Sequence, residues 1–97
     1  MDDNLKAVSY GHAVSNLGYE VKLGKEDLTW RDGKHAVSWE FKKQKDGKLL
    51  ILRKTRTVKK NKHEAEGGKD LGERELLIID QLVTKAIKVL RLNADWK

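Results

Sequence analysis

Between residues 19 and 58 the chain alternates apolar and polar residues, and this period of two constrains the fold more than any other feature. Val37, Trp39 and Phe41, for example, fall on one side of an extended chain, with polar residues between them. A strand with one apolar face must bury that face against another layer. The alternation therefore predicts a sheet that is covered on one side.

Two Asp-Gly pairs divide the alternating stretch. Asp32-Gly33 and Asp46-Gly47 lie between apolar-polar runs, and this dipeptide is a strong hairpin-turn signal. The stretch around residues 24–26 is a weaker turn candidate. We therefore expect an antiparallel meander of three long strands, or four strands if residues 24–26 form a turn.

The last strand, near Lys48–Val58, departs from the alternation. It begins with four consecutive apolar residues, Leu49–Leu52, and then becomes basic. In a strand such a run places apolar side chains on both faces. Both faces then need a cover, either a helix on each side or a second subunit.

A second feature, the helical periodicity of residues 73–92, predicts a long amphipathic C-terminal helix. Its apolar residues fill about half of the helical circumference, whereas a surface helix needs a stripe of only about 100°. Two contact surfaces are therefore expected. Together with Leu49–Leu52, this excess of apolar surface predicts a homo-oligomer.

Residues 4–17 predict a short N-terminal helix, because their apolar residues cluster at 100° per residue. Gly18 follows at a position suited to ending a helix. Gly11 argues against this prediction, since an interior glycine costs a helix about 1 kcal/mol relative to alanine.

The expected fold is a single α+β domain over residues 1–97: a short N-terminal helix, an antiparallel three- to four-stranded meander and a long C-terminal amphipathic helix. Residues 59–72 are polar, contain three glycines and are predicted to form a mobile loop before that helix.

Composition excludes several classes of function. The chain has no cysteine, which rules out disulfides, thiolate chemistry and cysteine-based zinc or iron–sulfur sites. Its longest apolar runs are four residues, far below the roughly 20 of a membrane span. The chain also opens with acidic residues where a secretory signal would be basic. We expect a cytoplasmic protein without membrane contact, metal or cofactor.

Charge is concentrated in one segment. Residues 42–62 contain ten basic residues and one acidic residue, a net charge of +9 in a chain whose total is +6. A basic β-ribbon and loop can contact nucleic-acid phosphates, with release of counterions driving the binding. Thr55 and Thr57 would add hydroxyl donors. The predicted nucleic-acid-binding residues are Lys43, Lys45, Lys48, Arg53, Lys54, Arg56, Lys59, Lys60 and Lys62.

Two other interpretations of this segment stay open. Lysines on an edge strand discourage aggregation, although four or five would be enough for that purpose. Alternatively, the same surface docks on an acidic protein, which would make the chain an inhibitor or a subunit of an assembly.

An enzymatic alternative is a small metal-dependent nuclease. Asp27 opens one expected strand and Glu40-Phe41-Lys42 closes the next, so two carboxylates and a lysine would adjoin one another. The order helix, strand, Asp, hairpin, Glu-x-Lys resembles the core of restriction-endonuclease-like nucleases over roughly residues 5–43. That resemblance implies catalytic roles for Asp27, Glu40 and Lys42 around Mg²⁺. A hairpin follows here where that family usually has a helix.

Trp30 and Trp39 have two possible roles. Both alternate with other apolar positions of the expected strands, which predicts that they belong to the core. The alternative is a platform on which unpaired bases stack.

Overall fold

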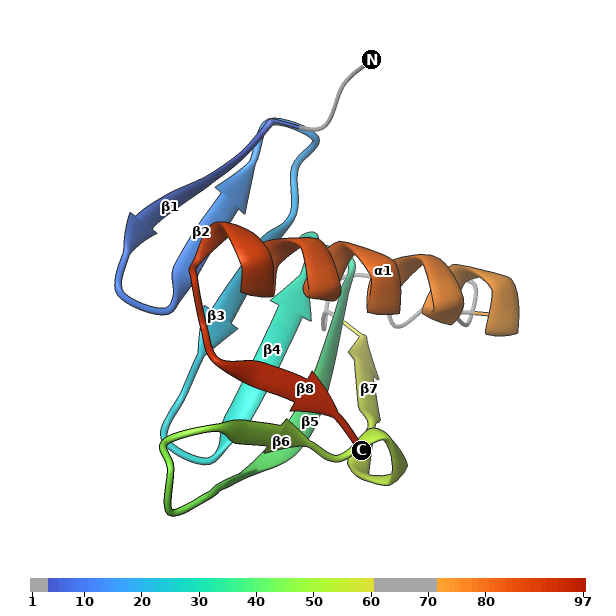
Figure 1. Ribbon diagram of the computed structural model, residues 1–97. Coiled ribbons are helices and arrows are strands. Elements are labelled where there is room, and N and C mark those ends of the chain that lie inside the picture. The colour runs from blue at the N-terminus through green and yellow to red at the C-terminus, as the bar shows by residue number, and fades with distance from the viewer. Residues whose placement is uncertain (1–3, 61–71) are drawn as a thin grey trace.

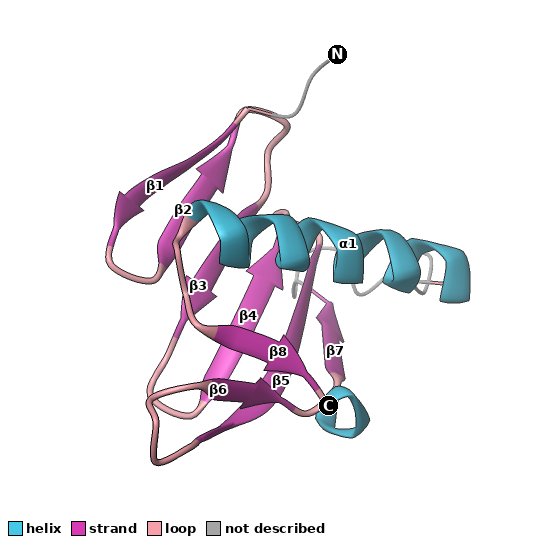
Figure 2. Cartoon of the chain, in the orientation of Figure 1, coloured by secondary structure: helices cyan, strands magenta, loops and turns pink. Residues whose placement is uncertain are grey.

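The computed structural model describes residues 4–60 and 72–97, which are mostly β-structure with one α-helix (Figure 1, Figure 2). A 3₁₀-helix, η1 (Arg53–Thr55), interrupts the strands, and α1 (Glu73–Val89) precedes the last one. The eight strands of the described residues are β1 (Leu5–Ser9), β2 (His12–Ser15), β3 (Glu20–Leu23), β4 (Asp27–Arg31), β5 (His35–Lys43), β6 (Leu49–Ile51), β7 (Thr57–Lys60) and β8 (Ala94–Trp96).

The strands form one mixed sheet. β1 to β5 pair with their neighbours in chain order, and every one of these pairs is antiparallel. Two strands then share the other edge of the nine-residue β5: β7 pairs with residues 35–38, and β6 pairs with residues 41–43. β8 pairs with β6 in parallel. The expectation of a simple antiparallel meander is therefore wrong, because the C-terminal residues return to extend the sheet.

The sheet curls around α1, which lies across its concave face (Figure 1). Alternate residues of the strands point inward and are buried against the helix. Val21, Val37 and Val83 are completely inaccessible. The main buried cluster consists of Leu5, Ala13, Tyr19, Val21, Leu28, Trp30, Val37, Trp39, Ile51, Ile79, Val83, Ala86 and Ile87.

Both strand tryptophans belong to this core. Trp39 is 1% exposed and Trp30 is 5% exposed, which confirms the core prediction and removes both from any base-stacking surface. Trp30 stacks on Tyr19 with ring centroids 6.0 Å apart. Asp32-Gly33 and Asp46-Gly47 form the predicted turns, at the β4–β5 and β5–β6 hairpins.

The predicted C-terminal helix is present as α1 but ends at Val89 instead of residue 92. Arg91 adopts the left-handed conformation, with φ of 56°, and the amide of Leu92 donates to the carbonyl of Ile87 at 3.0 Å. This is the hydrogen bond that closes a Schellman motif. The helix thus ends early enough for residues 94–96 to reach β6.

The predicted N-terminal helix is absent, because residues 4–17 form the β1–β2 hairpin. Three of the apolar residues that suggested a helical stripe are exposed, Tyr10 by 88%, Leu17 by 48% and Val14 by 38%, whereas Ala13 of the same stripe is buried. Alternate burial is seen in β2, where Ala13 and Ser15 are buried, while in β1 Leu5 alone is buried. A period of two in strands this short resembles a helical period when a turn separates them.

Gly11 explains why the chain turns here. Its φ is +71°, which favours glycine, and it lies in the turn between β1 and β2. Its carbonyl accepts a hydrogen bond from the amide of Leu23 at 2.7 Å. A Cβ at this position would lie only 2.9 Å from the Cβ of Leu23. The glycine that weakened the helix prediction is therefore required by the hairpin and by its contact with β3.

The expected last strand, residues 48–58, is split into β6 and β7 by η1. The amide of Leu52 still donates to the carbonyl of Glu40 at 2.8 Å, so the chain stays beside β5 as it passes into η1. The predicted mobile loop, 59–72, is also revised. Residues 59 and 60 belong to β7, and Gly72 adjoins α1. Residues 61–71 lie outside the described part of the chain.

The apolar run Leu49–Leu52 is covered within the chain itself. Leu49 and Ile51 are buried, and Leu50 and Leu52 are half-buried. β8 lies beside β6 and supplies part of this cover. On α1, however, Leu77 is 59% exposed and Ile78 is 49% exposed. Only these helix residues retain the excess of apolar surface on which the homo-oligomer prediction rests.

Trp96 connects the C-terminal strand β8 to both the sheet and α1. Its ring meets that of Trp39 edge to face, with centroids 5.3 Å apart, and its Nε1 donates to the hydroxyl of Thr84 at 2.9 Å. The hydroxyl of Thr84 in turn donates to the carbonyl of Asp80 at 2.8 Å. One side chain therefore connects β8, the buried tryptophan of β5 and α1.

Replacing Trp96 should reveal the strength of this connection. We expect Trp96→Ala to lower the free energy of unfolding by about 2–4 kcal/mol, since it removes a large, partly buried ring. Trp96→Phe keeps most of the packing and loses the hydrogen bond to Thr84, so its cost should be about 1 kcal/mol. Urea unfolding measures both values. Equal losses for the two variants would contradict the role assigned to packing.

Candidate nucleic-acid interface

The β5–β6 hairpin presents three of the predicted basic residues. Lys43 and Lys45 are exposed, while Lys48 is half-buried and its Nζ lies 3.6 Å from Oδ2 of Asp95. The turn between them is fixed by Asp46, whose Oδ1 accepts the amide of Lys48 at 3.0 Å. An ordered turn therefore carries two lysines that make no ion pair with a described residue.

The η1 segment carries the next three cations, Arg53, Lys54 and Arg56, all exposed. Thr55 between them is committed to the fold. Its hydroxyl donates to the carbonyl of Leu52 at 2.6 Å and accepts the amide of Glu40 at 2.8 Å. The expected role of this hydroxyl as a phosphate donor is therefore replaced by a structural one, which ties η1 to β5.

Arg53 and Arg56 lie toward α1 and β8. The guanidinium carbon of Arg53 is 5.1 Å from the centroid of the Trp96 ring, a cation–π distance. The amide of Arg53 also donates to the carbonyl of Lys97 at 3.1 Å. Both arginines act electrostatically on Asp80 of α1. This acidic neighbour could not be predicted, because Asp80 is more than 20 residues away along the chain.

Asp80 is an unusual group for this position. Burial raises the pKa of its carboxyl above the ordinary value of 3.8, and the charges of Arg56 and Arg53 offset only part of that effect. Its Oδ1 is buried and has no hydrogen-bond partner among the described residues. The carboxylate thus neutralises part of the charge of η1 at a cost to stability.

β7 supplies the last described cations. Lys59 is exposed and lies opposite Ala36 of β5, on the face of the sheet away from α1. Lys60 pairs with His35 through the backbone. Lys62, the remaining predicted binding residue, lies outside the described part of the chain.

The described basic positions follow one border of the sheet, from the β5–β6 turn through η1 to β7 (Figure 1). We call this border the basic edge and define it as residues 42, 43, 45, 48, 53, 54, 56 and 59. Within residues 4–60 and 72–97, Lys48 is the one member with an ion pair to a carboxylate. Most of the charge on this edge is therefore turned toward solvent.

The candidate nuclease residues are also brought together. Asp27 of β4 lies directly opposite Glu40 of β5, and Lys42 follows two residues later on the same outward face. Within the described ranges, no group of three or more His, Asp or Glu side chains is placed to hold a metal. The helix that the nuclease resemblance implied before these strands is replaced by the β1–β2 hairpin. Two exposed carboxylates across one strand pair are the remaining basis for that reading.

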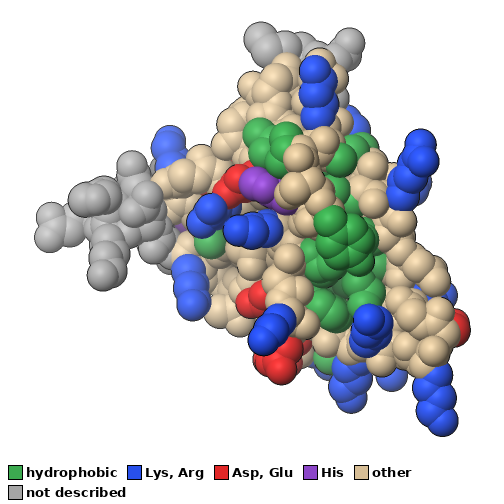
Figure 3. Space-filling model, turned by 90° about the vertical axis from the view of Figure 1, so that its left-hand side faces the viewer, with side chains coloured by type: hydrophobic (Ala, Val, Ile, Leu, Met, Phe, Trp, Pro, Cys, Tyr) green, Lys and Arg blue, Asp and Glu red, His purple; other side chains and the backbone are tan. Residues whose placement is uncertain are grey.

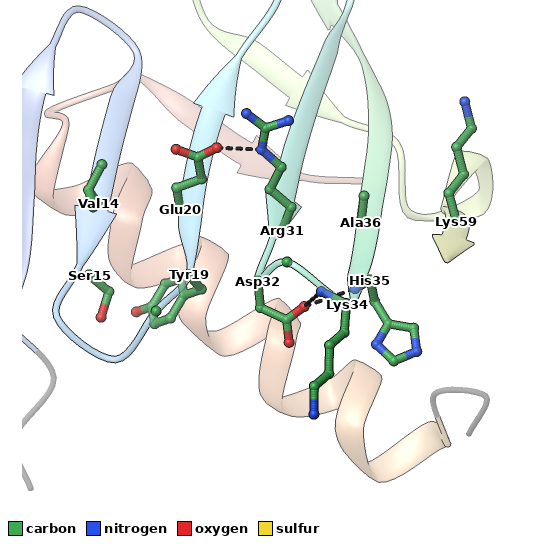
Figure 4. A pocket seen from close by; sticks show the side chains of 12 residues that line it. Val14, Ser15, Tyr19, Glu20, Arg31, Asp32, Lys34, His35, Ala36 and Lys59 are labelled. Atoms are coloured by element: carbon green, nitrogen blue, oxygen red, sulfur yellow. Dashed lines mark hydrogen bonds and ion pairs between the residues drawn. The ribbon is translucent and has the colours of Figure 1, made fainter. Parts of the chain in front are cut away.

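The outward face of the sheet contains a cavity of about 610 Å³ that sequence reasoning missed. It lies between the end of β2, the residues before β3, the β4–β5 turn and β7 (Figure 4). Its basic lining residues are Arg31, Lys34 and Lys59, and its acidic ones are Glu20 and Asp32. Only Lys59 belongs to the segment of concentrated charge, so charge counting gave no signal for this site.

Glu20 organises one wall of this cavity. Its carboxylate is bonded by Nε2 of His12 at 2.9 Å and by Nε of Arg31. These hydrogen bonds, His12 first and Arg31 second, lower the pKa of Glu20 below its ordinary value of 4.5. The three residues come from adjacent strands, β2, β3 and β4, and they hold the Arg31 side chain in place across the sheet.

A further surface feature is apolar. Val8, Tyr10, Val14 and Leu17 of the β1–β2 region are exposed. Figure 3 views the side on which β1 and β2 lie in Figure 1, and it shows hydrophobic side chains in the middle of this face with lysines and arginines around them. The homo-oligomer expectation, which rests on α1, stays a prediction.

A comparison with models of known protein families, with curated proteins and with solved structures gives no match. In the described ranges, no helix has the length and apolar character that crossing a membrane requires.

Replacement of Glu20 should produce a pH-dependent loss of stability. The folded-state pKa is below the unfolded value, so the ion pair stabilises the protein above about pH 4.5 and this contribution disappears as the pH falls through the folded-state pKa. We expect Glu20→Gln to cost about 0.5–1 kcal/mol at pH 7. Urea unfolding of both proteins between about pH 3 and pH 7 checks this. A difference that stays constant over that range would contradict the account.

Replacement of Asp80 should act in the opposite direction. Because burial raises its folded-state pKa, ionisation of Asp80 costs stability once the pH rises above 3.8. We expect Asp80→Asn to increase the free energy of unfolding at pH 7 by up to about 1 kcal/mol. The gain should vanish under acidic conditions, where Asp80 is protonated and is therefore neutral, as the asparagine of the variant is. Destabilisation by Asp80→Asn at pH 7 would show that attraction to Arg53 and Arg56 outweighs burial.

Proposed function

We propose that this protein binds nucleic acid without catalysing a reaction, and that the basic edge makes the contacts. The main support is the set of exposed lysines on this edge that make no ion pair with a described carboxylate, namely Lys42, Lys43, Lys45, Lys54 and Lys59. Such cations attract phosphates, and the release of condensed counterions from the nucleic acid then drives association. On this proposal the protein acts in the cytoplasm, in keeping with its lack of cysteine.

The distribution of the cations favours phosphates over bases as the groups contacted. The basic edge passes through a turn, a 3₁₀-helix and a strand, so its side chains follow no single groove-reading element. Trp30 and Trp39, the candidate stacking residues, are buried. Phosphate contacts fix position but carry little sequence information. We therefore expect weak sequence preference.

Binding to labelled single- and double-stranded DNA and RNA should be measured by fluorescence anisotropy at several salt concentrations. The proposal predicts affinity in the micromolar range or better for at least one of them, with log K falling linearly against log salt. If about four of the cations contact phosphates, the slope on B-DNA is about −3.6, since each contact contributes about −0.9.

A matched pair of triple variants makes this measurement specific. Lys43→Gln, Lys45→Gln and Lys54→Gln together remove three charges from the basic edge, and Lys6→Gln, Lys25→Gln and Lys88→Gln remove three exposed charges from elsewhere. The first set should weaken binding at least about tenfold and make the slope less negative by up to about 3. The second should change affinity by less than about threefold. Equal losses would show that only net charge matters.

An acidic protein partner is the competing use of the same edge. It predicts no saturable binding to any of the four nucleic acids, even at low salt. That result would overturn the proposal and would leave the basic edge as a protein-docking surface.

A further inference from the structure

The cavity on the outward face of the sheet has the size and lining of a small-ligand site. Its volume of about 610 Å³ lies within the range of about 300–1,000 Å³ typical of such sites. Small residues make up part of its lining, namely Val14, Gly18, Gly33 and Ala36, and longer side chains surround them (Figure 4). The small residues therefore form an apolar floor, and charged side chains form the walls of the cavity. This arrangement suits a ligand with both apolar and ionic parts.

Arg31 is the most strongly positioned cation of this cavity. Its Nε bonds to Glu20, and Glu20 is bonded in turn by His12 of β2. In the described part of the chain no second acceptor is recorded for the Arg31 guanidinium. Four further N–H donors remain on its two terminal nitrogens, in the planar fork that matches a phosphate group. An arginine that is already oriented loses less side-chain entropy when a ligand binds.

The remaining charges of the lining add to this preference for an anion. Lys34 and Lys59 are exposed and make no ion pair with a described residue. Asp32, the second carboxylate of the lining, uses Oδ1 to accept the amides of Lys34 and His35, each at 2.9 Å. Both acidic side chains thus hold the site together but keep their negative charge, so the three basic and two acidic side chains leave the lining with a net charge of +1.

We infer that this cavity binds a phosphate-bearing group of nucleotide size, with the phosphate on Arg31 and the rest of the ligand against Val14 and Ala36. Lys34 and Lys59 stand at its sides and strengthen the attraction to the anion. A free nucleotide and a nucleotide at the end of a strand share this chemistry. The cavity shares only Lys59 with the basic edge, so this inference can be tested independently of the proposed nucleic-acid interface.

Isothermal titration calorimetry of the full chain with adenosine monophosphate, adenosine and inorganic phosphate tests this inference. We expect saturable binding of the monophosphate with a Kd of about 0.1–1 mM, and binding of adenosine weaker by about tenfold or more. Adenosine that binds as well as its monophosphate, or no saturable binding of the monophosphate below about 10 mM, would overturn the inference.

Variants locate the binding. Arg31→Gln should weaken binding of adenosine monophosphate about tenfold or more, and Lys34→Gln should weaken it by a smaller factor. Lys25→Gln, an exposed lysine outside the cavity, is the matched control and should leave the Kd within about twofold. The Arg31 side chain is 60% exposed, so its replacement should leave the fold intact, and Lys34→Gln provides an independent check. Full affinity in both variants would place the ligand elsewhere and contradict the inference.

Two further experiments distinguish a free nucleotide from a strand end as the ligand, and they distinguish this inference from the proposed nucleic-acid interface. A short oligonucleotide with a 5′-phosphate that binds more tightly than its 5′-hydroxyl form, and does so only when Arg31 is present, would assign the cavity to a strand end. Equal binding of the two oligonucleotides would assign it to free nucleotides. The triple variant at Lys43, Lys45 and Lys54 retains every lining residue of the cavity and should bind adenosine monophosphate normally, even if it no longer binds long nucleic acids.

Discussion

The packing of α1 against the concave face of the sheet forms the core and decides which face of each strand is open to solvent. The inward residues of five neighbouring strands form an apolar surface, and Val83 and Ala86 of the helix are completely inaccessible against it. Burial of apolar surface makes the largest favourable contribution to the free energy of folding of a domain of this size. Because one face of the sheet is reserved for this contact, the polar residues of each strand face outward. The cavity, the facing pair Asp27 and Glu40 and the Lys59 side chain are all consequences of that separation.

Charge is organised by the same constraint. On the outward face, Glu20 holds Arg31 in place, and it is helped by His12. On the basic edge, Asp95 pairs with Lys48, and Asp80 adjoins Arg53 and Arg56. The remaining exposed lysines of the edge lack a described carboxylate. These acidic side chains therefore orient particular cations, and the other lysines of the basic edge stay available to a ligand. This difference is the basis for assigning separate roles to the cavity and the basic edge.

Sequence reasoning succeeded where a local signal decides the structure. The Asp-Gly pairs predicted two hairpins, alternation placed Trp30 and Trp39 in the core, and a long helical period predicted α1. It failed for residues 4–17, where two short strands and a turn imitate a helical period and only Gly11 pointed to the turn. It also missed the return of residues 94–96 to β6, because three residues carry too little pattern to predict a strand.

Most of the basic edge is contiguous in sequence and could be predicted. The cavity joins residues from five strands and two turns, so it forms only when the sheet is assembled.

Chemical-shift mapping can show whether the basic edge is the surface that binds nucleic acid. Backbone amides of the ¹⁵N-labelled protein would be followed while a short oligonucleotide is added at low salt. We expect the largest shifts at residues 43–48 and 53–59, with smaller changes at the lining of the cavity and none along the buried residues of α1. Shifts confined to the exposed apolar residues of the β1–β2 hairpin, or no shifts at saturating oligonucleotide, would contradict it.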